Sequence, residues 1–127
     1  MGFDMSEVRD LATDLLSAEG KVRTAVQVSV KRGAMNVKRD AQRNIIGQVG
    51  RAHAKHYASS ITFDVLPGGL AAEIGPTIGY RQAFLGKILE FGTATSAPHP
   101  HMVPAAEQEQ GRLAEGVLVA AMDALGG

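Results

Sequence analysis

Two pairs of histidines have the spacing that metal binding would need. His99 and His101 flank Pro100, so on an extended segment both imidazoles would point to the same side. His53 and His56 are three residues apart and could share one face of a helix. No third ligand lies near either pair in the sequence, and the chain has no cysteine. We therefore expect no metal and no cofactor, and interpret His99 and His101 as exposed or interface residues.

Glu90 is the acid best placed for general acid–base catalysis, because it is the one acid in the run from residue 88 to residue 93. No second carboxylate, nucleophile or histidine accompanies it at a recognisable spacing. We interpret Glu90 as a charge at a helix end that pairs with a basic residue of the same or the next subunit. The glycine-rich segments 68–69 and 75–79 lack the residues of a phosphate-binding loop, so they indicate turns. The sequence thus predicts a protein that is not an enzyme.

Three prolines stiffen the segment that carries these histidines. Pro98, Pro100 and Pro104 each fix φ, and the residues before them are pushed toward extended conformations. We call residues 93–104 the strap, and expect it to be an ordered, extended arm. A helix over 80–91 should precede it, and a helix over 104–125 should follow it.

Gly92 and Thr93 join the first of these helices to the strap. Gly92 is the expected C-cap, because glycine adopts the left-handed conformation that commonly ends a helix. The Thr93 hydroxyl can bond nearby backbone groups at the same point. Together they should reverse the chain direction.

The first half of the chain is predicted to be helical. A short amphipathic helix is expected over 4–18, with Asp4 as N-cap, Glu7 as its capping-box partner and Gly20 as the stop. Its apolar face consists of Val8, Leu11, Ala12, Leu15 and Leu16.

A long helix is expected over 21–46, followed by a break at Gly47 and Gly50. Gly33 lies within its apolar stripe, where glycine costs about 1 kcal/mol relative to alanine. It should therefore either kink the helix or permit close approach of a neighbour. Residues 51–57 could form one more turn or a basic loop.

A β-hairpin is the clearest strand signal. Apolar and polar residues alternate over 60–76 around a turn at 67–69. Because two strands alone make a marginal sheet, the hairpin should pack on the long helix or gain strands from neighbouring subunits. Its apolar residues include Ile61, Phe63, Val65 and Ile74. The predicted fold class is α+β: N-terminal helices including a long one, a central hairpin, a short helix, the strap and a C-terminal helix.

The composition indicates one domain, residues 1–127, without a membrane span. The net charge is zero, but it is unevenly distributed. Residues 20–57 hold nine bases and one acid, whereas residues 1–19 and 58–127 each carry a net charge of −4. The basic stretch could be a solvated helix face, a subunit interface paired with the acidic ends, or a DNA-contacting face. The basic residues that could face DNA or an interface are Lys31, Arg32, Lys38, Arg39 and Arg43.

The stretch from residue 88 to residue 105 resembles the head–tail joining and tail-completion (neck) proteins of long-tailed bacteriophages. The shared pattern is an apolar residue followed by Glu-aromatic-Gly-Thr, a short linker, and Pro-x-Pro-x-Met-x-Pro-Ala. At His101 the family pattern has a large apolar residue, often Phe. The matching residues are Glu90, Phe91, Gly92, Thr93, Pro98, Pro100, Met102, Pro104 and Ala105.

The resemblance implies a virion protein made in the bacterial host cytoplasm and placed at the neck or the top of the tail. Subunits would form a homo-oligomeric ring around the DNA channel, between head-connector proteins and tail-tube or terminator proteins. The strap and hairpin would supply the contacts, with His99 and Met102 among the strap residues. Two alternatives stay open: a tail terminator ring that caps the tail tube, and a DNA-binding protein that uses residues 21–55.

Overall fold

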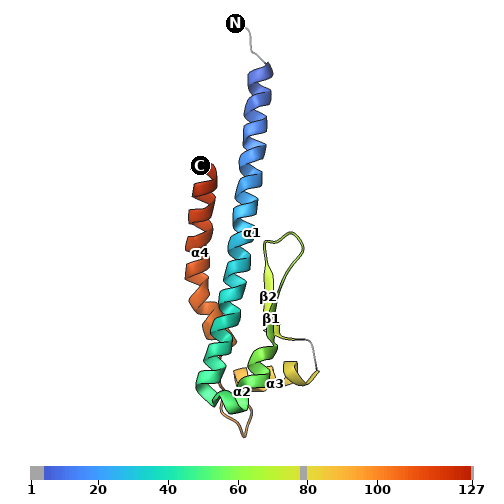
Figure 1. Ribbon diagram of the computed structural model, residues 1–127, viewed down its shortest axis with the longest axis vertical. Coiled ribbons are helices and arrows are strands. Elements are labelled where there is room, and N and C mark those ends of the chain that lie inside the picture. The colour runs from blue at the N-terminus through green and yellow to red at the C-terminus, as the bar shows by residue number, and fades with distance from the viewer. Residues whose placement is uncertain (1–4, 78–79, 127) are drawn as a thin grey trace.

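One long helix is the axis of the molecule (Figure 1). The computed structural model describes residues 5–77 and 80–126. Helix α1 (Met5–Val49) contains 45 residues and is about 68 Å long at the usual rise per residue. Helix α4 (Met102–Gly126) packs antiparallel beside it, and α1 continues beyond the end of α4.

A hairpin lies on the other side of α1 from helix α4 (Figure 1). Strands β1 (Ile61–Val65) and β2 (Ala72–Pro76) pair antiparallel, with Phe63 opposite Ile74. Two short helices, α2 (Arg51–Ser60) and α3 (Tyr80–Phe91), close the lower end in this view. The α+β class expected from the sequence is confirmed, and the proline-rich strap connects α3 to α4.

The expected break near Gly20 is wrong, because α1 is continuous from Met5 to Val49. A glycine inside a helix costs only about 1 kcal/mol, which the neighbouring turns can offset. Gly47 is also helical, and the chain turns only at Gly50, whose φ of 83° is left-handed. The expected N-cap, Asp4, lies outside the described residues. Residues 51–57, left open between a turn and a loop, belong to α2.

Gly33 permits close approach of α4 to α1. A Cβ atom at Gly33 would lie 3.1 Å from Leu113 Cδ1, which is tighter than an ordinary van der Waals contact. On the following turns, Asn36 Nδ2 donates to Glu109 Oε1 at 3.1 Å. Arg112 of α4 reaches Asp40 of α1, with Nη2 2.9 Å from Oδ2. The close approach predicted as one of two roles for Gly33 is therefore the one seen.

The buried core lies at the lower end, where α1 meets α2, β1 and the start of α4. The hairpin is tied to α1 at both ends: Ile61 packs in this core, and Gln27 Nε2 donates to the Gly68 carbonyl at 2.9 Å. The hairpin therefore packs on the long helix, one of the two expected arrangements. The fully or nearly buried apolar residues of the cluster are Val37, Ala41, Ile45, Ala54, Tyr57, Ala58, Ile61 and Ala105.

Replacement of Gly33 tests the α1–α4 contact. We expect Gly33→Val to lower the free energy of unfolding by about 1–3 kcal/mol, because the added methyl groups push α4 away. Gly20→Ala is the matched control, since a Cβ atom there meets nothing within 4 Å, and it should raise that free energy by about 0.5–1 kcal/mol. Urea unfolding followed by circular dichroism measures both. Equal shifts in the two variants would contradict the assigned role of Gly33.

Candidate functional site

The Glu90 carboxylate holds the end of the strap against the start of α4. Glu90 lies near the end of α3, and its side chain is almost fully buried. Its Oε1 accepts the backbone N–H of Met102 at 2.7 Å, and Oε2 accepts that of Val103 at 3.3 Å. The His101 N–H lies 3.2 and 3.3 Å from the two oxygens. One carboxylate therefore satisfies three free N–H groups at the positive end of α4.

The His101 side chain is fully buried beneath this cap. Its Nδ1 lies 2.9 Å from the His99 carbonyl oxygen and 3.3 Å from Glu90 Oε1. Because both neighbours are acceptors, Nδ1 carries the proton and Nε2 accepts the Tyr57 hydroxyl at 2.7 Å. The rings of Tyr57 and His101 meet edge to face, with centroids 5.3 Å apart.

Tyr57 links this cluster to α2 and α3. Burial of its hydroxyl, together with the negative charge of Glu90, raises the pKa of Tyr57 to about 12. Gly86 of α3 lies so close to the hydroxyl that a Cβ atom there would be 2.8 Å from it. The hydroxyl is therefore enclosed on the α3 side as well.

Gly92 reverses the chain after α3. Its φ of 74° is left-handed, and its N–H bonds the Ile88 carbonyl at 2.7 Å, as expected of a C-cap. A Cβ atom at Gly92 would lie 2.7 Å from the Ser96 carbonyl oxygen, so only glycine fits. The Thr93 hydroxyl accepts the N–H groups of Thr95 and Ser96 at 3.3 and 3.1 Å. The backbone-bonding role predicted for Thr93 is confirmed.

The far end of the strap is bonded to α1 and α3. The His99 N–H donates to the Leu89 carbonyl at 2.5 Å. From α1, Gln48 Nε2 donates to the Pro100 carbonyl at 2.5 Å and Asn44 Nδ2 to the His101 carbonyl at 3.3 Å. The strap is thus held at both ends, in agreement with the ordered arm that its prolines predict.

The outer surface of the strap is exposed and uncharged. Phe91, at the end of α3, is 70% exposed, although it is the largest apolar side chain beside the reversal. Pro98 and Pro100 are exposed, whereas His99 and Met102 are half-buried. Between Lys87 and Glu107 the one charged residue is the buried Glu90. Pro104, expected at the first helical position, is exposed in the first turn of α4, which begins two residues earlier.

Glu90, expected to pair with a basic residue of the same or the next subunit, has Oε1 3.3 Å from His101 Nδ1 and bonds the backbone N–H groups of α4. The expectation for His101 is wrong. His101 is neither exposed nor on an extended face shared with His99, because its ring fills a core position beside Tyr57. Local spacing could not reveal either role, since the partners lie 11 to 13 residues from Glu90 and 44 residues from His101.

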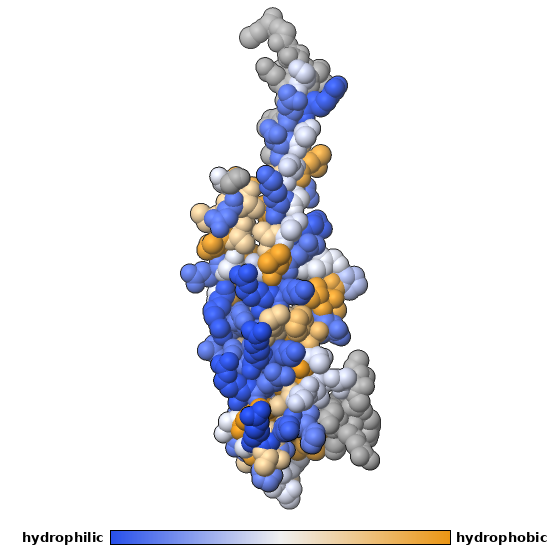
Figure 2. All heavy atoms as spheres, viewed as in Figure 1, coloured by the Kyte–Doolittle hydropathy of each residue, from blue (hydrophilic) through white to orange (hydrophobic). Residues whose placement is uncertain are grey.

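The other predicted residues lie away from the strap. On the hairpin, Ile61 is buried, Phe63 and Ile74 are half-buried, and Val65 is exposed. The basic residues lie on α1: Lys31, Arg32, Arg39 and Arg43 are exposed and Lys38 is half-buried. Figure 2 shows a broad hydrophilic area over the lower half of α1 and the adjoining part of α4.

The described residues offer no cluster of ligands typical of a metal site. In the ranges 5–77 and 80–126, no three histidine or acidic side chains lie close enough together to hold a metal ion. No helix in those ranges has the length and apolar character needed to cross a bilayer. The Glu90–His101–Tyr57 cluster is buried and its polar atoms bond one another or the backbone. Its geometry is therefore that of a structural anchor.

Loss of the Glu90 charge tests this anchor. We expect Glu90→Gln to lower the free energy of unfolding by about 1–3 kcal/mol, because an amide offers one acceptor oxygen and no charge to α4. Glu107→Gln, an exposed position in the first part of α4, should change it by less than about 0.5 kcal/mol. Chemical unfolding curves give both values. The assigned capping role fails if the two variants are equally stable.

The raised pKa of Tyr57 predicts an alkaline loss of stability. Because protonated Tyr57 is favoured in the folded chain, its contribution is complete below the ordinary pKa of 10.0 and declines as the pH rises through about 12. Stability measured against pH should therefore fall over this interval in the natural chain, and the fall should be smaller in Tyr57→Phe. Ultraviolet titration of phenolate should show one late-ionising tyrosine that is missing from Tyr57→Phe.

Comparison of the chain with protein-family models, curated proteins and solved structures found no match. The family resemblance therefore rests on the pattern between residues 88 and 105.

Proposed function

We propose that this chain is a structural virion protein at the head–tail interface of a long-tailed bacteriophage. In this role it forms part of a ring that joins the DNA-filled head to the tail, and it carries out no catalysis. The strap is the docking element, which contacts a neighbouring subunit or the adjoining ring.

The observation that carries this proposal is an exposed, uncharged surface on a backbone that is already ordered. Phe91 is mostly exposed beside Gly92, and Pro98 and Pro100 are exposed on the strap. The central part of a protein interface is typically poor in charge and rich in aromatic residues. Glu90 and the side-chain amides of Asn44 and Gln48 in α1 hold the strap in place. Docking of the strap would therefore cost little conformational entropy.

A second candidate function is DNA binding through α1. Exposed bases at Lys31, Arg32, Arg39 and Arg43 favour it, since phosphate contacts require such cations. Asp40, which lies 3.7 Å from Arg43 and 2.9 Å from Arg112, offsets part of this charge. No aromatic platform for bases accompanies these residues on α1, so this candidate would rest on phosphate contacts alone.

Deletion of the gene from the phage or prophage that carries it tests the main proposal. Negative-stain electron microscopy of the lysate should show filled heads beside free tails of normal length. Overlong tail tubes would instead assign the chain to tail termination. Intact virions would contradict both roles, and salt-dependent DNA binding by the purified chain would then be the function to examine.

Complementation with Phe91→Ser separates docking from folding. Because Phe91 is mostly exposed, the substitution should change the free energy of unfolding by less than about 0.5 kcal/mol yet reduce the fraction of joined virions. Leu118→Ser is the matched control, since Leu118 is 59% exposed and lies on α4 away from the strap. Equal joining by the two variants would show that Phe91 is not a contact residue. Gly92→Val would not separate docking from folding, because its Cβ would lie 2.7 Å from the Ser96 carbonyl oxygen and disturb folding itself.

A further inference from the structure

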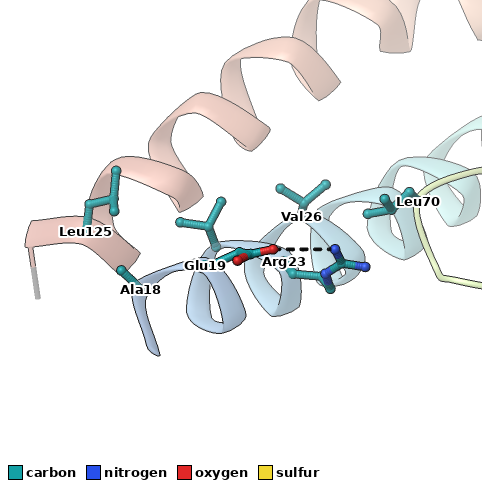
Figure 3. Close-up of a pocket in the computed structure, with 7 residues that line it drawn as sticks. Ala18, Glu19, Arg23, Val26, Leu70 and Leu125 are labelled. Atoms are coloured by element: carbon teal, nitrogen blue, oxygen red, sulfur yellow. Dashed lines mark ion pairs between the residues drawn. The ribbon is translucent and has the colours of Figure 1, made fainter. Parts of the chain in front are cut away.

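Within residues 5–77 and 80–126, no helix packs along the first part of α1 (Figure 1). Leu125, near the end of α4, lines a shallow hollow with Ala18 and Val22 of α1, and Figure 3 shows Leu125 and Ala18 on the two helices. Residues 5–17 therefore continue beyond the end of α4, as Figure 1 shows, and Leu16 is 68% exposed. A helical section of this length is marginal in water without packing partners. Its stability would increase if another surface covered it.

A matched charge pattern lies along one side of α1. Asp10 and Asp14 are four residues apart, and so are Arg39 and Arg43. About eight whole helical turns separate Asp10 from Arg39, and the same number separates Asp14 from Arg43. All four side chains therefore project from the same side of α1. All four are exposed. Within the described part of the chain, no ion pair involves Asp10, Asp14 or Arg39.

We propose that two copies of this chain associate through antiparallel α1 helices. Asp10 and Asp14 of each copy then lie opposite Arg43 and Arg39 of the other. The equal four-residue spacing makes both contacts possible in one register, and the two-fold axis repeats them. The uncovered section of each α1 is thereby covered by the basic half of the second copy.

The residues at the centre of this register also suit the contact. The two-fold axis falls between residues 26 and 27, and Val28, which is 53% exposed, projects from the same side of α1 as the charged residues. The two Val28 side chains would therefore meet near the axis. In the same register Lys21 faces Arg32, which opposes association. Since exposed ion pairs are individually weak, the dimer should be weak and should loosen as salt is added.

The charge pattern favours a second copy over DNA as the occupant of this side. Asp10 and Asp14 would repel phosphate from the part of α1 that a long DNA contact would also cover. In a parallel, staggered pair, the acids of only one copy would face the arginines of the other. In the antiparallel pair, the acids of each copy face the arginines of the other. The contact is isologous and closes at two copies. It goes beyond the proposed function, because ring assembly would require a different surface such as the strap.

A pair of complementary variants tests the register. Two double variants reverse these charges, namely Asp10→Lys/Asp14→Lys and Arg39→Glu/Arg43→Glu. Each should bind itself about tenfold more weakly than the natural chain, or dissociate at about tenfold lower concentration of added salt. Mixed in equal amounts, the two variants should associate, because each then offers the charges that the other lacks. Sedimentation equilibrium at low salt over a concentration series measures the four dissociation constants, those of the natural chain, of each variant and of the mixture.

The control is Arg51→Glu/Lys55→Glu, which makes the same change in net charge as Arg39→Glu/Arg43→Glu but at exposed residues of α2. It should dimerise like the natural chain, and circular dichroism should show equal helix content in every variant. A natural chain that stays monomeric throughout the series would overturn the proposal. So would a mixture of the two variants that does not associate.

Cysteine cross-linking provides a second, independent test of orientation, because the chain has no cysteine of its own. Val28→Cys should form a disulfide-linked dimer on mild oxidation, since this position lies close to the two-fold axis. Ser17→Cys should not, because its antiparallel neighbour is Asn36. Cross-linking at both positions would indicate parallel helices and overturn the proposal. These tests use the purified chain alone, so their failure leaves the role of the strap in virion assembly unaffected.

Discussion

The structure depends on one buried carboxylate at the N-terminus of α4. Three backbone N–H groups at this helix start, of which that of His101 is buried and those of Met102 and Val103 are partly buried, would otherwise lack partners within the helix. A fully buried N–H group without a partner costs about 1–3 kcal/mol. Glu90 bonds all three from the end of α3 and thereby joins two helices that are separated in sequence by the strap. The same carboxylate approaches the His101 ring, which in turn bonds Tyr57 of α2. A single side chain thus fixes how α2, α3 and α4 meet.

This arrangement explains why a segment with three prolines can be ordered without strand or helix hydrogen bonds of its own. Gly92 turns the chain and Thr93 closes the turn. The side-chain amides of Asn44 and Gln48 in α1 donate hydrogen bonds to the strap carbonyls. The carbonyls of Pro100 and His101 are therefore directed toward α1, while Phe91 and two prolines remain exposed. An interaction surface of this kind needs no rearrangement before it binds a partner.

Helix α1 separates two kinds of surface. Its lower half supplies three of the eight buried core residues, Val37, Ala41 and Ile45, and the side-chain amides that hold the strap, so it belongs to the folding unit. Its first turns lie beyond α4 and carry acids, whereas the exposed side farther along carries arginines. Zero net charge consequently conceals a strong asymmetry along one helix. That asymmetry is a physical basis for self-association, and the uncharged strap is a physical basis for docking to a different surface.

Sequence patterns alone determined the type of most elements, because helical and strand periodicity, glycine ends and prolines are local properties. They divided α1 into two helices and did not decide between a turn and a loop for residues 51–57, which belong to α2. They located the hairpin, the Gly92 reversal and the backbone bonds of Thr93 correctly. They failed at Gly20, where the propensity cost of one glycine was too small to end a helix. Only the tertiary structure decided the roles of Glu90 and His101. Their partners are backbone N–H groups and a tyrosine from other elements, and no local spacing encodes which distant groups will meet when a core forms.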